Sequence, residues 1–132
     1  MVVQCGVLSM NIKAFRTIIF SSLIIMLGSI IFAHMNLEKT EPAHNTTLSS
    51  QPQHLQMWFT QEPDLTVTKV ELKGQDGIIE LGEVHLMGEK TLMAMIKGNM
   101  SDGTYTVNWQ TAGDDGHIQK GEFVFKIGQA EN

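Results

Sequence analysis

The stretch GTYTVNWQTAGDDGHIQKGEFVFKI, residues 103–127, indicates the fold class of this chain. Both ends of the stretch carry large apolar residues at every second position: Tyr105, Val107 and Trp109 in the first part, and Phe123, Phe125 and Ile127 in the last. A period of two is that of a β-strand with one buried face. Between these parts, Asp115-Gly116 is a frequent hairpin turn. The stretch therefore predicts two strands joined by a short loop.

Five shorter runs before this stretch are also rich in branched or apolar residues: 54–60, 66–73, 77–81, 83–87 and 91–97. Turn-forming glycines and aspartates fall between several of the runs. Short strands at this spacing predict an all-β fold, an antiparallel β-sandwich of about seven strands. The polar segment 44–53 is expected to be an irregular surface connection.

The beginning of the chain differs in composition from the rest. Lys13 and Arg16 precede an uncharged, largely apolar run, residues 17–32, and the small residue Ala33 follows it. This order is typical of a secretory signal peptide, and the run is shorter than the roughly 20 residues that a spanning helix prefers. We predict that residues 1–33 are a signal peptide cleaved after Ala33, and that residues 34–132 form a domain outside the membrane. An uncleaved anchor is the alternative.

The predicted mature domain is acidic and has no cysteine. Cys5, the single cysteine, lies in the predicted signal peptide, so the domain has no disulfide and no thiolate ligand. Without Lys13 and Arg16, seven basic residues remain against fourteen acidic ones, a net charge of −7 with neutral histidines. Such a surface repels nucleic acid and mildly favours cations. The composition therefore argues against nucleic acid as a partner.

Cleavage after Ala33 would give His34 a free α-amino group beside its imidazole. Once deprotonated, these two nitrogens can hold one metal ion in a chelate ring within a single residue. Cu(II) prefers planar or tetragonal nitrogen and oxygen ligation. His117 can supply a third nitrogen and Asp115 an oxygen, because the glycine between them lets both side chains leave a sharp loop in one direction. The simpler interpretations are an ordinary Asp-Gly turn and a solvated loop histidine.

Two segments of the mature sequence, taken together, are similar to a known family. HMNLEKTEPAHNTTL begins with histidine and has Pro42 eight residues later, and residues 103–127 contain G-T-Y-x-V-x-W, then D-G-H, then an aromatic strand. In these features the chain resembles the CopC family of secreted copper-binding proteins, over nearly all of residues 34–127. The resemblance implies an immunoglobulin-like Greek-key sandwich with a Cu(II) site. The ligands it implies are the amine and imidazole of His34, Asp115 and His117.

One position departs from the family pattern. The family often has a glutamate shortly after the phenylalanine of its second strand, which can contribute near Cu(II). Here that position is Gln61, and Glu62 stands one place later. Adjacent strand residues point in opposite directions, so Glu62 does not simply replace Gln61. Participation of either residue stays open, and Asp114 is interpreted as part of the turn.

The segment EVHLMGEKTLMAMIK contains candidates for a second copper site. Some family members carry a Met/His-rich stretch that binds Cu(I), an ion that soft thioether sulfur suits. The candidates here are His85, Met87, Met93 and Met95. Methionine also fills irregular gaps in hydrophobic cores, and core packing is the favoured interpretation of these methionines. The remaining two histidines, His44 and His54, are expected to be solvated.

These observations predict a periplasmic, non-enzymatic protein that binds Cu(II) and buffers or delivers it, in copper resistance or homeostasis. The family resemblance implies a separate CopD-like inner-membrane copper transporter as recipient. Two alternatives come from other classes. One is a small copper oxidase or monooxygenase with a histidine brace, and the other is an immunoglobulin-like adhesion or assembly module without a metal.

Overall fold

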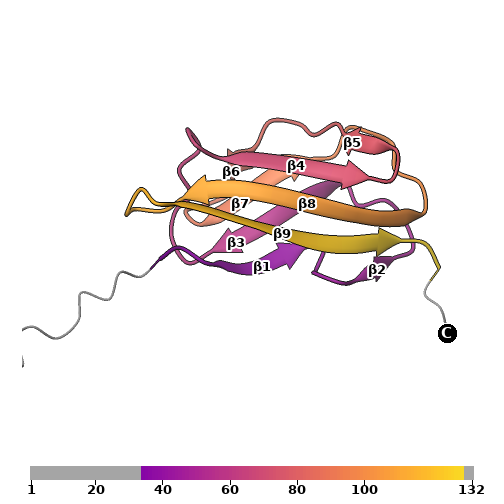
Figure 1. Ribbon diagram of the computed structural model, residues 1–132, viewed down its shortest axis with the longest axis horizontal. Coiled ribbons are helices and arrows are strands. Elements are labelled where there is room, and N and C mark those ends of the chain that lie inside the picture. Colours follow the sequence, from indigo (N-terminus) through magenta and orange to yellow (C-terminus); the bar gives the residue numbers. More distant parts are fainter. Residues whose placement is uncertain (1–33, 130–132) are drawn as a thin grey trace, which may run out of the picture. The chain divides into compact units, whose positions relative to one another are not determined.

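The computed structural model describes residues 34–129, which form nine β-strands in two sheets that pack face to face (Figure 1). The strands are β1 Leu37–Glu41, β2 Thr47–Leu48, β3 His54–Phe59, β4 Lys69–Gly74, β5 Gly77–Ile79, β6 His85–Leu86, β7 Thr91–Met95, β8 Gly103–Ala112 and β9 Ile118–Ile127. One sheet has the strand order β1-β3-β7-β6 and the other β2-β9-β8-β4-β5. The chain passes repeatedly between the sheets, and the predicted all-β sandwich is confirmed.

The core lies between the sheets and is built largely from alternate residues of three strands, β3, β8 and β9. Their inward side chains are at most 5% exposed: Leu55, Met57, Phe59, Tyr105, Val107, Phe123, Phe125 and Ile127. The ring of Phe59 meets that of Trp109 edge to face, with centroids 5.3 Å apart. Each fully buried apolar side chain contributes about 1.5–3 kcal/mol. The period-two pattern in the sequence thus marks the strands that hold the sandwich together.

The β8–β9 hairpin is the longest paired element of the fold. The two strands pair without a break, from Gly103 opposite Ile127 to Ala112 opposite Ile118. At the tip, Gly116 has a φ of 70°, a left-handed conformation that favours glycine, and its N–H donates to the Gly113 carbonyl over 2.9 Å. The tip lies at the same end of the sandwich as the start of β1 (Figure 1).

Two edge strands were not predicted from the sequence. In β1, Thr40 is the one buried residue, so the strand shows no alternation. β2 lies inside segment 44–53, where the prediction of an irregular connection is wrong at Thr47–Leu48. It pairs in parallel with β9 through two residues. Backbone pairing rather than an apolar face forms these strands, and periodicity therefore does not detect them.

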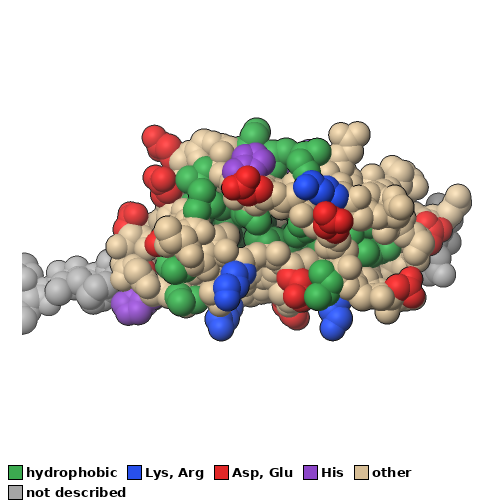
Figure 2. Space-filling view, turned by 90° about the horizontal axis from the view of Figure 1, so that it is seen from above, with side chains coloured by type: hydrophobic (Ala, Val, Ile, Leu, Met, Phe, Trp, Pro, Cys, Tyr) green, Lys and Arg blue, Asp and Glu red, His purple; other side chains and the backbone are tan. Residues whose placement is uncertain are grey.

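The predicted signal peptide, residues 1–33, lies outside the described part of the chain. Within residues 34–129, no helix is long and apolar enough to cross a membrane. Figure 2 shows acidic side chains scattered over the face seen from above, with fewer basic ones among them. This distribution agrees with the acidic composition of the domain.

Candidate metal centre

His34 is held in place by the two residues that follow it. The side chain of Met35 is only 2% exposed and belongs to the core. The Asn36 backbone forms two hydrogen bonds with Thr60: its N–H donates to the side-chain Oγ1, and its carbonyl accepts from the Thr60 backbone N–H, both over 2.9 Å. The Asn36 side chain also donates to the His34 carbonyl over 2.9 Å. The segment before β1 is therefore anchored, and it presents His34 at the end of the sandwich.

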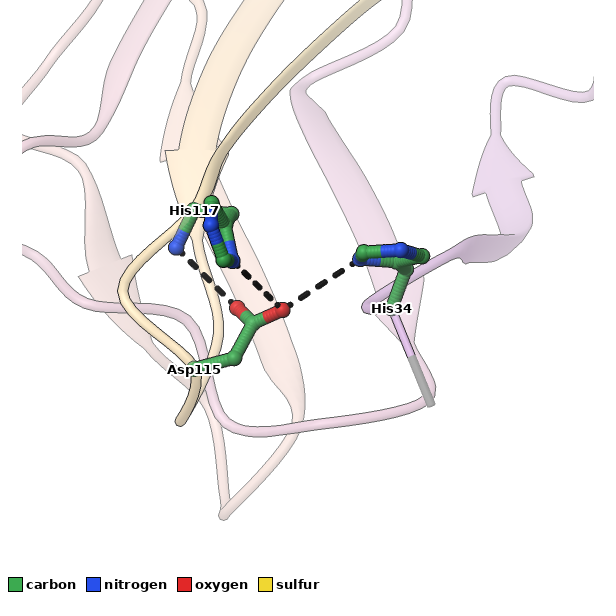
Figure 3. A group of neighbouring side chains, drawn as sticks. All are labelled: His34, Asp115 and His117. Atoms are coloured by element: carbon green, nitrogen blue, oxygen red, sulfur yellow. Dashed lines mark hydrogen bonds and ion pairs between the residues drawn. The ribbon is translucent and has the colours of Figure 1, made fainter. Parts of the chain in front are cut away.

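Asp115 and His117 are arranged by the tip of the β8–β9 hairpin. The His117 backbone N–H donates to Asp115 Oδ1 over 3.0 Å, so the carboxylate closes a turn with its own loop. The left-handed Gly116 between them makes this reversal possible. As a result, the two side chains rise on the same side of the loop (Figure 3).

The three residues, which come from distant parts of the sequence, meet at one carboxylate oxygen. His34 Nδ1 lies 3.3 Å from Asp115 Oδ2, and His117 Nδ1 lies 3.1 Å from the same atom. The imidazoles stand on either side of the carboxylate, with ring centroids 6.1 Å apart (Figure 3). One ligand atom from each residue lies within 4.8 Å of the others. The predicted site residues are thus brought together.

Exposure and charge suit this cluster to a cation. The side chains of His34 and His117 are 58% and 66% exposed, whereas that of Asp115 is 16% exposed. The hydrogen bond from the His117 backbone, followed by that from the His117 ring, lowers the pKa of the Asp115 carboxyl below its usual range. Asp115 is therefore a carboxylate at neutral pH, and it faces two nitrogens that solvent can reach.

The orientation of His34 matters for chelation. A metal bound by the α-amino nitrogen and Nδ1 of one histidine closes a six-membered ring, whereas Nε2 lies on the far side of the imidazole. Here Nδ1 is the His34 nitrogen that faces Asp115. With the α-amine that cleavage would release, the two imidazole nitrogens and the carboxylate oxygen would form a donor set that fits Cu(II). Ala33 lies outside the described residues, so cleavage before His34 stays a prediction.

Gln61 and Glu62 take different places beside the cluster. Gln61 Oε1 accepts a hydrogen bond from the Asp114 backbone N–H over 3.1 Å, so this side chain contacts the loop that carries Asp115. Glu62 is exposed and does not belong to the cluster of candidate ligands. Asp114 is exposed within the turn, which agrees with its interpretation as a turn residue.

The candidate methionines face outward, away from the core. In β7, Leu92 and Ala94 are fully buried while Met95 is 43% exposed, and Met87, which follows β6, is 52% exposed. The core interpretation is therefore wrong for Met87 and Met95, although Met35 and Met57 are core residues. Strand register places His85 opposite Met93 and His54 opposite Met95 on the outer face.

The residues that hold the candidate ligands in place could not be predicted from the sequence. Met35 is one of six methionines in residues 34–132. The contacts between Asn36 and Thr60 and between Gln61 and Asp114 join segments far apart in the chain. The alternation of β3 predicts that a strand ends near Phe59, but not what the residues after it touch.

Comparison with known proteins identifies relatives along most of the chain. A family model described as the CopC domain matches residues 37–128. Protein YobA of Escherichia coli (strain K12) is 26% identical over 100 residues, which are 74% of this chain and 81% of YobA. The copper transport protein CutJ of Bacillus subtilis (strain 168) is 26% identical over 117 residues, 86% of this chain but 22% of CutJ. This chain therefore matches only about a fifth of CutJ.

Solved structures have the same fold. CopC from Methylosinus trichosporium OB3b superposes with a TM-score of 0.64 and 18% identity, over 75% of this chain and 98% of the other. PcoC from Escherichia coli, described as a methionine-rich copper resistance protein, superposes with a TM-score of 0.64 and 20% identity, over 72% of this chain and 99% of PcoC. With the family match over residues 37–128, these findings place the chain in the CopC domain family.

Proposed function

We propose that this chain is a periplasmic Cu(II)-binding protein that begins at His34 after signal cleavage and buffers or delivers copper. The observation that carries the proposal is the meeting of His34 and His117 at one oxygen of Asp115. The three residues contribute two nitrogens and one oxygen, and cleavage adds the α-amine of His34. Such a set favours Cu(II), whose tetragonal geometry accommodates nitrogen and oxygen donors.

The relatives support copper as the cargo. CutJ is a copper transport protein by name, and PcoC is described as a copper resistance protein. The region of CutJ that resembles this chain is 22% of its length. We propose that this chain passes copper to a separate CopD-like transporter in the inner membrane.

A binding role fits the site better than an oxidative one. Oxygen chemistry at copper needs free coordination positions, and the Asp115 carboxylate, which lies between the two imidazoles, would occupy one of them as a ligand. We therefore propose a non-enzymatic protein. Oxidation of polysaccharide by the copper-loaded domain with a reductant and peroxide would contradict this part of the proposal.

A second, Cu(I) site is proposed on the outer face of β6 and β7. The observation that favours it is the outward orientation of soft donors there: His85 lies opposite Met93, Met95 follows on the same face, and the nearby Met87 is exposed. Thioether sulfur and imidazole suit Cu(I). Replacing Met93 and Met95 by leucine is expected to abolish Cu(I) binding measured against a chromogenic Cu(I) chelator. The same replacement of Met100, which packs against the core, serves as the control.

The Cu(II) proposal is tested by titration of the mature domain against a chromogenic Cu(II) chelator. We expect one equivalent to bind tightly, and His117→Ala to weaken binding because a nitrogen ligand is lost. His44→Ala is the matched control, since His44 is exposed and its Nδ1 accepts from the Val124 backbone, outside the cluster. Equal weak binding by all three proteins would contradict the proposal.

A further inference from the structure

Two consecutive residues after β3 contact the two halves of the candidate metal centre. Thr60 Oγ1 accepts from the Asn36 N–H and so holds the segment that carries His34. Gln61 Oε1 accepts from the Asp114 N–H and so holds the hairpin tip. The pair Thr60-Gln61 thus connects the two segments whose side chains meet at Asp115.

The packing around Gly113 strengthens this connection. Gly113 is buried, and a Cβ at this position would overlap Gln61 Oε1 and lie 3.0 Å from the Cβ of Met35. Gly113, which precedes the turn, therefore has no free space on the side where Gln61 and Met35 lie. Because interiors are packed without spare volume, a shift of one of these groups is felt by the others.

We propose that Gln61 is a positioning residue of the copper site. Its amide oxygen fixes the Asp114 peptide and thereby sets where the Asp115 carboxylate and the His117 imidazole stand relative to His34. The inference rests on the proposed Cu(II) function and adds a specific residue to it. Gln61 acts through the loop rather than as a ligand, because its oxygen already accepts the Asp114 N–H and a neutral amide competes poorly with nitrogen donors for Cu(II).

The role of Gln61 depends on its acceptor oxygen, and this separates positioning from simple packing. Gln61→Leu keeps a side chain of similar volume but removes the oxygen that accepts the hydrogen bond from the Asp114 N–H. Gln61→Glu keeps an acceptor oxygen at the same place. Gln53→Leu, at an exposed glutamine before β3, is the matched control. Supporting hydrogen bonds around a metal site are typically worth about 10–100-fold in metal affinity.

The experiment measures Cu(II) affinity by chelator competition, the electron paramagnetic resonance spectrum at one equivalent, and the thermal midpoint of the metal-free domain for these variants and the native sequence. We expect Gln61→Leu to bind about 10–100-fold more weakly with a shifted spectrum. Gln61→Glu should bind at least as tightly as the native sequence, and the control should match the native sequence throughout.

The outcomes separate the two proposals. If the native domain itself fails to bind one equivalent of Cu(II), the proposed function is wrong. If it binds, but Gln61→Leu binds equally well with an identical spectrum, the positioning role alone is overturned. The positioning role is also overturned if Gln61→Glu is as weak as Gln61→Leu, because the acceptor oxygen is then irrelevant and loss of packing explains the effect.

Discussion

The Nδ1 atom of His34 lies 3.3 Å from the Oδ2 atom of Asp115, although the two residues stand at opposite ends of the domain sequence. A buried side chain on one side and a tight turn on the other create this contact. The core side chain of Met35 fixes His34, and a tight turn around Gly116 fixes Asp115. A metal site built this way depends both on the sandwich and on its hairpin tip.

Removing the charge of Asp115 tests its role as a ligand. Asp115→Asn keeps the shape of the side chain but replaces the carboxylate by a neutral amide, so we expect Cu(II) affinity to fall at least about tenfold. Chelator competition measures the loss. Asp114→Asn is the neighbouring control, because Asp114 is exposed and lies outside the cluster. An equal loss in both variants would mean that only the general negative charge of the loop matters.

The carboxyl group of Asp115 should make the stability of the metal-free domain depend on pH. Folding lowers the pKa of Asp115 below its ordinary value of 3.8. Its contribution to stability is therefore fully present above that value and disappears as the pH falls through the lower folded-state pKa. We expect the thermal midpoint of Asp115→Asn to lie below that of the native domain at neutral pH and to converge with it in acid. A constant difference down to the acid limit would contradict this assignment.

Copper binding itself should weaken on acidification for another reason. The amine and imidazole nitrogens bind metal only when deprotonated. Asp115, whose pKa lies below 3.8, stays ionised in mildly acidic solution. We therefore expect Cu(II) affinity to fall on acidification in Asp115→Asn as well as in the native domain. A clearly flatter profile in the variant would assign the pH dependence to the carboxyl instead.

Met35 should affect both stability and the site. Met35→Ala and Met57→Ala each remove a buried methionine and are expected to lower the free energy of unfolding by about 2–5 kcal/mol. Only Met35→Ala should also shift the Cu(II) electron paramagnetic resonance spectrum, because Met35 directly follows His34. The same spectrum in both variants, measured where both remain folded, would show that Met35 does not position His34.

Substitution of Gly121 by alanine is expected to lower the stability of the domain without changing its affinity for Cu(II). A Cβ at this position would lie 2.6 Å from Cζ2 of the Trp109 ring, so Gly121→Ala should destabilise the domain by about 1–3 kcal/mol. Gly82→Ala is the control, since its nearest contacts would be an ordinary 3.4 Å. Denaturant unfolding measures the difference, and equal stability of the two variants would contradict it.

The sequence predicts the long strands and the candidate ligands because both depend on local patterns. Alternation in β8 and β9 fixes which residues face the core, and Asp115-Gly116 places the turn. The methionines show the limit of such patterns. Both faces of β7 are apolar in sequence, and only packing of Leu92 and Ala94 against the other sheet leaves Met95 outside.

The hydrogen bonds that position the candidate ligands could not be predicted from local sequence patterns for a related reason. Gln61 and Asp114 are distant in sequence, and their hydrogen bond exists only once the two sheets pack and bring the end of β3 to the hairpin tip. β2 forms in the same way, because its two residues pair with β9 rather than with a neighbouring segment. Interactions of this kind are set by the tertiary structure and leave no periodic signal.

We propose that His34 binds Cu(II) through its own α-amine, and a comparison of two forms of the domain tests this. One form begins at His34, and the other carries a single glycine before it. At one equivalent of Cu(II), we expect a nitrogen-rich tetragonal electron paramagnetic resonance spectrum from the first form, and its loss or alteration in the second. Identical spectra and equal weak binding by both forms would contradict the claim, and the meeting of His34, Asp115 and His117 would then need another explanation.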